Sequence, residues 1–83
     1  NQEQIKNLAD KMDVMIIIGS FTSANSKRLT LLSQKINTRT YQVTCKDDLK
    51  DNWFVNCNSV GISAGASTPD YLIDEVKDKI ISL

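Results

Sequence analysis

An uninterrupted apolar run is the feature that most constrains this fold. Residues 14–18 are Val-Met-Ile-Ile-Ile, and Gly19 follows directly. A strand with one solvent-exposed face alternates apolar and polar residues, whereas a continuous apolar run is typical of a strand buried on both faces, as in parallel sheets. Small polar residues at 20–26 then lead into Lys27 and Arg28, a pattern typical of a loop that turns into a helix. The sequence therefore predicts a strand, a loop and a helix in that order.

A second unit with the same order lies near the end of the chain. Residues 59–63 form the predicted strand, residues 64–68 the loop, and residues 69–81 the helix. Pro69 suits a first helical position, because its missing N–H has no partner there, and Thr68 is then the expected N-cap. Both loops contain a glycine, Gly19 in the first and Gly65 in the second.

The remaining elements complete an alternating pattern. We expect an amphipathic helix at 2–12, a helix from 25 or 26 to 36, a strand at 40–44 and a short helix at 48–55. Ser23 or Asn25 is the expected N-cap of the second helix, and Asn37 its C-terminal stop. Lys46 and the two aspartates after it are expected to form a turn.

This alternation predicts one α/β domain over residues 1–83. We expect a small three-layer sandwich with a mostly parallel sheet, strands at about 14–18, 40–44 and 59–63, and helices on both faces. With right-handed crossovers, the simplest doubly wound arrangement has the strand order 2-1-3, with a topological switch between the first and third strands. Ligands in such sheets bind at the carboxyl ends of the strands beside the switch, where the loops 19–25 and 64–68 leave.

The side chains in these two loops suit a phosphate. Short neutral donors predominate there, and two helix N-termini would direct free N–H groups at an anion. The candidates are Ser20, Thr22, Ser23, Asn25, Ser67 and Thr68. Glycines would let the backbone approach the anion closely. Plain helix capping by the same residues, with Gly65 as a turn residue, also explains the pattern and stays open. Neither a P-loop nor a dinucleotide fingerprint is present.

Composition narrows the possible functions. Ten basic and ten acidic residues cancel, which disfavours a nucleic-acid partner, and histidine is absent. No apolar run approaches the ~20 residues that a membrane span requires, so we expect no membrane partner. Cys45 and Cys57 match no metal or redox spacing and are expected to be reduced thiols of a cytoplasmic protein. The chain begins in a helical pattern without Met, so we expect a piece of a longer protein.

Two segments carry a resemblance to a known family. Residues 14–29 read VMIIIGSFTSANSKRL and residues 60–73 read VGISAGASTPDYLI. Together, at this separation, they resemble the C-terminal domain of the 4-hydroxy-3-methylbut-2-enyl diphosphate reductase family, also known as penicillin tolerance proteins. The resemblance extends to Asn1-Gln2-Glu3, to 47–49, to Trp53 and to the last helix, so it covers nearly the whole chain.

The resemblance implies an iron–sulfur oxidoreductase of the methylerythritol phosphate pathway of isoprenoid biosynthesis. Such an enzyme reduces an allylic hydroxy diphosphate to isopentenyl and dimethylallyl diphosphate with loss of water. Its three similar α/β domains surround a cavity that holds a [4Fe-4S] cluster on three cysteines. A ferredoxin- or flavodoxin-type donor supplies the electrons, and the location is the cytoplasm of bacteria or a plastid.

The resemblance also assigns a role to particular residues. It makes Ser23, Ala24, Asn25 and Ser67 the residues that bind the substrate diphosphate. Ala24 departs from the serine usual in the family and keeps only its backbone N–H as a donor. The cluster cysteine of this domain would lie just before Asn1, and the family's histidines and acid lie in the other two domains. We therefore expect neither a catalytic residue nor a metal ligand here, and a fragment that is inert alone.

Two alternatives from other classes stay open. In the first, both loops are merely capped helices and the chain is a non-catalytic interaction domain. In the second, the chain is a phosphotransfer domain with Cys45 as the nucleophile. That mechanism needs a thiol pKa lowered by Lys46 and by the N-terminus of the helix that follows. No base accompanies the thiol in the sequence.

Overall fold

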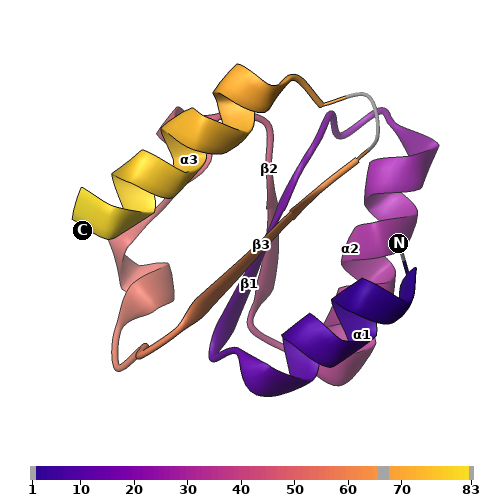
Figure 1. Ribbon diagram of the computed structural model, residues 1–83, viewed down its shortest axis with the longest axis horizontal. Helices are drawn as coiled ribbons and strands as arrows, with labels where there is room; N and C mark the ends of the chain where they lie inside the picture. The colour runs from indigo at the N-terminus through magenta and orange to yellow at the C-terminus, as the bar shows by residue number, and fades with distance from the viewer. Residues whose placement is uncertain (1, 66–67, 83) are drawn as a thin grey trace.

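The chain folds around a parallel three-stranded sheet covered by helices on both faces (Figure 1). The computed structural model describes residues 2–65 and 68–82, with side chains from residue 6 onward. The elements are α1 (Gln2–Lys11), β1 (Val14–Ile18), α2 (Ala24–Ile36), β2 (Thr40–Val43), β3 (Val60–Ala64) and α3 (Asp70–Ser82), with two short 3-10 turns, η1 (Lys46–Asp48) and η2 (Asp51–Phe54). The strand order is β2-β1-β3 and both pairings are parallel, which confirms the predicted fold class and order.

The central strand β1 is buried along its whole length because its side chains serve two cores. Met15 and Ile17 pack with Ala9 of α1 and Leu29 of α2 on one face of the sheet. The other three β1 side chains pack on the opposite face with Val43 of β2 and Val76 of α3. Burying such an aliphatic side chain stabilises the fold by about 1.5–3 kcal/mol, so both layers depend on this strand. The unbroken apolar run follows from this arrangement.

The element boundaries differ from the predicted ones by a residue or so. Strand β2 ends at Val43, and β3 spans Val60–Ala64 where 59–63 was expected. Helix α2 begins at Ala24 with Ser23 as its N-cap and Asn37 as its C-cap. Helix α3 begins at Asp70, so the expectation of Pro69 at its first position and Thr68 as its cap is wrong by one residue.

The predicted short helix at 48–55 is wrong, because contacts with residues 39–44 hold this segment as η1 and η2. The Asp48 carboxylate accepts hydrogen bonds from the backbone N–H and the hydroxyl of Thr44, at 2.8 and 2.6 Å. The Arg39 guanidinium donates to the Trp53 carbonyl at 2.8 Å. The Trp53 ring stacks on Tyr41 with 4.2 Å between centroids. These contacts outweigh the weak local preference for a helix.

Within the described part of the chain, no helix is both long enough and apolar enough to cross a membrane.

Candidate functional site

The two predicted loops meet at the carboxyl ends of β1 and β3, at the same edge of the sheet (Figure 1). One carbonyl, that of Ile18 at the end of β1, joins them. It accepts a hydrogen bond from the backbone N–H of Gly65 at 3.2 Å and another from the Thr68 hydroxyl at 3.1 Å. The sheet topology therefore brings together residues up to 50 positions apart in the sequence, as predicted.

Ser26 occupies the space between the two loops. Its side chain is buried, and a Cβ added to Gly19 would lie 2.0 Å from its hydroxyl oxygen, while one added to Gly65 would lie 2.6 Å from the same atom. Neither glycine has a positive φ, so neither is needed for an unusual backbone conformation. Both glycines make room for Ser26, a role that the sequence did not predict.

The N-terminus of α2 carries three of the four predicted diphosphate-binding residues. The Ser23 hydroxyl oxygen accepts a hydrogen bond from the Ser26 N–H at 3.3 Å, and the hydroxyl proton is left to donate elsewhere. Ala24 and Asn25 are exposed, and N–H groups in a first helical turn have no acceptor within the helix. The Asn25 amide nitrogen lies 3.7 Å from the Cβ position of Gly65, so this side chain reaches toward the second loop.

The fourth predicted residue, Ser67, lies outside the described residues.

Three other predicted donors hold the loops in place. The Ser20 and Thr22 hydroxyls are hydrogen-bonded to each other at 2.8 Å, and the Thr22 N–H donates to the Ser20 hydroxyl at 3.2 Å. The Thr68 hydroxyl donates to Ile18, as described above. The Gln42 amide donates to the Ser20 carbonyl at 3.1 Å. Sequence reasoning missed Gln42, since only the pairing of β2 with β1 brings it beside this loop.

A hollow of about 310 Å³ opens beside the loops and is lined by Gly19, Ser20, Thr44, Thr68, Pro69 and Leu72. Thr44, one of these lining residues, is hydrogen-bonded to Asp48. Hydrogen bonds from the Thr44 hydroxyl and then from its backbone N–H hold the pKa of the Asp48 carboxyl below its ordinary value. The Asp48 charge is thus stabilised by Thr44, which donates both bonds to one carboxylate oxygen, Oδ2.

The described residues do not fit an iron–sulfur cluster. They contain no group of three or more His, Cys, Asp or Glu side chains close enough to hold a metal ion. Cys45 follows β2 at the carboxyl edge of the sheet, whereas Cys57 precedes β3 at the amino edge. Parallel strands that rise about 3.3 Å per residue separate these two edges by roughly 15 Å, so the two thiols cannot share one cluster.

The nucleophile alternative loses its structural support. It required a helix after Cys45, and the segment that follows is a single 3-10 turn, Lys46–Asp48, which carries two aspartates. One such turn has a small dipole and lacks the helix N-terminus that this mechanism requires.

Comparison with known proteins places the chain in a family. The sequence model of the LytB protein family matches residues 1–81. A curated relative from Aquifex aeolicus (strain VF5) is 48% identical over 79 residues, which cover 95% of this chain and 27% of the relative. A relative from Campylobacter concisus (strain 13826) is 49% identical over 80 residues, which cover 96% of this chain and 29% of the relative. Both relatives are named 4-hydroxy-3-methylbut-2-enyl diphosphate reductase.

Solved structures agree. The chain matches (E)-4-hydroxy-3-methyl-but-2-enyl diphosphate reductase, described as the terminal enzyme of the non-mevalonate pathway, with a TM-score of 0.97 and 46% identity over 99% of this chain and 29% of the other. It matches a reductase from Plasmodium falciparum with a TM-score of 0.83 and 28% identity over 99% of this chain and 25% of the other. The chain thus spans less than a third of the length of these relatives. The chain belongs to the LytB family.

Proposed function

We propose that residues 1–83 form a single domain, the diphosphate-binding C-terminal domain of a larger three-domain 4-hydroxy-3-methylbut-2-enyl diphosphate reductase. The longer protein would be an iron–sulfur oxidoreductase that converts the allylic hydroxy diphosphate to isopentenyl and dimethylallyl diphosphate in the methylerythritol phosphate pathway. Family membership supports this proposal, and so does the small share of each relative that the chain spans.

One observation carries the proposed role of this domain, namely the junction of the two loops at Ile18 and Ser26. The junction brings the N-terminus of α2 next to the loop after β3, which supports the proposal that both loops bind one anion. The Ser23 hydroxyl, the Ala24 N–H and the Asn25 amide would bind the diphosphate from the first loop, and Ser67 would bind it from the second. A helix N-terminus stabilises an anion placed there.

Ala24 weakens this site without abolishing it. A hydrogen bond to a charged group contributes about 1.5–3 kcal/mol, and the serine usual in the family would supply one more of them. Ala24 is an exposed residue at the first position of α2, where its backbone N–H has no acceptor within the helix. We infer that it contacts the diphosphate in place of a side chain.

The contribution of this domain would be positioning. The cluster and the acid–base groups would come from the other two domains of the longer protein, and a ferredoxin- or flavodoxin-type protein would supply electrons. Holding the diphosphate in one orientation fixes the reacting end of the substrate in the cavity between the domains. The chain alone is then catalytically inert.

The test uses the full-length protein with Asn25→Ala, and Lys35→Ala as the matched control. Lys35 lies in the last turn of the same helix and is exposed, far from the loops. Loss of a hydrogen bond to a charged group should raise KM for the diphosphate substrate, and Ki for competing inorganic pyrophosphate, about 10-fold or more. The control should change neither constant.

A folded Asn25→Ala protein with the parental iron content and unchanged pyrophosphate inhibition would contradict the proposal. It would favour the alternative in which the loops are only capped helices of an interaction domain.

A further inference from the structure

Strand β3 forms one edge of the sheet and, among the described residues, pairs only with β1. The Val14 N–H donates to the Ser59 carbonyl and the Gly65 N–H donates to the Ile18 carbonyl, both at 3.2 Å. Alternate residues of a parallel strand bond to the same neighbour, so Gly61 and Ser63 face β1. The backbone groups of Val60, Ile62 and Ala64 therefore point away from the sheet.

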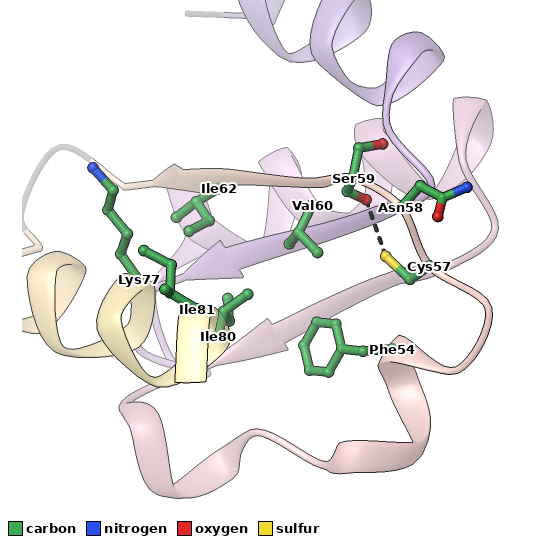
Figure 2. A pocket seen from close by; sticks show the side chains of 9 residues that line it. All are labelled: Phe54, Cys57, Asn58, Ser59, Val60, Ile62, Lys77, Ile80 and Ile81. Atoms are coloured by element: carbon green, nitrogen blue, oxygen red, sulfur yellow. Dashed lines mark hydrogen bonds between the residues drawn. The ribbon is translucent and has the colours of Figure 1, made fainter. Parts of the chain in front are cut away.

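A hollow of about 410 Å³ lies beside this edge, on the face that α3 covers, and its lining is mostly apolar, with Asn58 and Ser59 at one end (Figure 2). Val60 and Ile62 of β3 form its floor, Ile80 and Ile81 of α3 one wall, and Phe54 of η2 another. The Ile81 side chain is 73% exposed, an unusual fraction for a large apolar residue beside a core. Lys77 extends along the wall and is the only charged residue of the lining.

The edge lacks the features that keep a free strand from pairing. Strand β3 contains neither a charged residue nor a proline, which are the usual protection of an exposed edge. The β2 edge differs, because the Asp48 carboxylate binds the N–H of Thr44 just past that strand. The Tyr41 side chain of β2 is also covered by Trp53. The segment 46–54 thus occupies the surroundings of β2, and nothing equivalent within the described residues lies along β3.

We propose that an extended segment of the longer protein, from outside these 83 residues, pairs with β3 as a fourth strand and fills the hollow with its apolar side chains. Only a polypeptide backbone offers donors and acceptors at the spacing of Val60, Ile62 and Ala64. Alternate side chains of such a strand would point to the α3 face and enter the hollow, where Val60, Ile62 and Ile80 favour apolar side chains.

The length of the relatives supports a segment of the same polypeptide as the occupant. The chain spans 27–29% of the curated relatives described above, so most of each relative lies outside the matched region. A tethered segment reaches the edge at an effective concentration on the order of millimolar, which a second copy of the protein does not match in dilute solution. The proposal does not depend on the proposed diphosphate site, which would lie at the carboxyl ends of the strands and not along the side of β3.

Amide hydrogen exchange in the full-length protein tests the pairing. Ser63 faces β1 and should be protected whether or not a fourth strand is present, so it is the internal control. The proposal predicts that the Ile62 N–H is protected to within about tenfold of Ser63, because it would donate to the added strand. An Ile62 N–H that exchanges as fast as a free amide while Ser63 is protected would overturn it.

Photo-crosslinking identifies the occupant. A photoreactive residue in place of Ile81 in the full-length protein should join it, at the mass of one polypeptide, to a peptide outside residues 1–83. The matched control replaces Leu31, which is 53% exposed on α2 at the opposite face, and should not join that peptide. Cross-links from residue 81 that join two polypeptides would overturn the proposal and make β3 an interface between copies.

Discussion

Gly65→Ala tests whether Ser26 sets the separation of the two loops. The new methyl group would lie 2.6 Å from the Ser26 hydroxyl oxygen, while the next neighbours are at 3.7 Å, an ordinary contact. Overpacking of this kind costs about 1–3 kcal/mol. Alanine also lowers the conformational entropy of the unfolded chain, which offsets about 0.4–1 kcal/mol of this destabilisation. The offset applies here because the φ of Gly65 is not positive, so alanine can adopt it. We expect a net destabilisation of about 1–2 kcal/mol, measured by urea unfolding of the chain.

A second substitution identifies the atom responsible. Ser26→Ala removes only the hydroxyl oxygen, so it should relieve the clash in Gly65→Ala, with a coupling of about 1–2 kcal/mol in a double-mutant cycle. Ser26→Ala should not restore the stability of Gly19→Ala. A Cβ at position 19 would also lie 2.6 Å from the Ser26 Cβ, which alanine keeps. Rescue of both glycine variants, or of neither, would refute this account of the junction.

Two further predictions concern Asp48 and Ala24. Because hydrogen bonds from Thr44 lower the pKa of Asp48 in the folded chain below the ordinary 3.8, Asp48 should contribute stability above that pH and lose its contribution as pH falls below it. Urea unfolding between about pH 6 and 2 compares the parental chain with Asp48→Asn. The parental chain should have the higher free energy of unfolding near pH 6, and this difference should shrink in the acid range. A difference that is independent of pH would contradict this cause. In the full-length protein, Ala24→Ser should lower KM for the diphosphate substrate by up to about tenfold, since it restores a hydroxyl donor, and an unchanged KM would mean that the Ala24 N–H already suffices.

The sequence was sufficient for the sheet because its signals are local. The apolar run at 14–18 identifies a strand buried on both faces, and right-handed crossovers leave few ways to arrange three parallel strands. The segment 48–55 was predicted incorrectly for the opposite reason. Its conformation depends on Arg39 and Tyr41, whose contacts with Trp53 are made only after the sheet has formed.

In the candidate site, too, local features were predicted from the sequence and features that depend on distant residues were not. Capping of α2 by Ser23 is confirmed, because a cap depends on residues three positions apart. The role of Ser26 was not predicted, since it depends on two glycines 46 positions apart in the sequence that approach one hydroxyl only in the folded chain. Thr68 was expected to bind an anion or cap a helix, and its hydroxyl instead donates to the Ile18 carbonyl.

Ser23→Asp separates the two interpretations of the first loop, which a change to alanine would confuse. Aspartate caps a helix as well as serine does and is favoured by the helix dipole, so the stability of the chain should be unchanged or slightly higher. The aspartate carboxylate also removes the hydroxyl donor of Ser23 and places a negative charge beside the proposed diphosphate. If Ser23 binds the substrate, KM in the full-length protein should rise about 10- to 100-fold, because like charges repel and a charged hydrogen bond is lost. If Ser23 only caps α2, KM should stay at its parental value while the stability is unchanged or slightly higher, and the proposed role of this loop would be refuted.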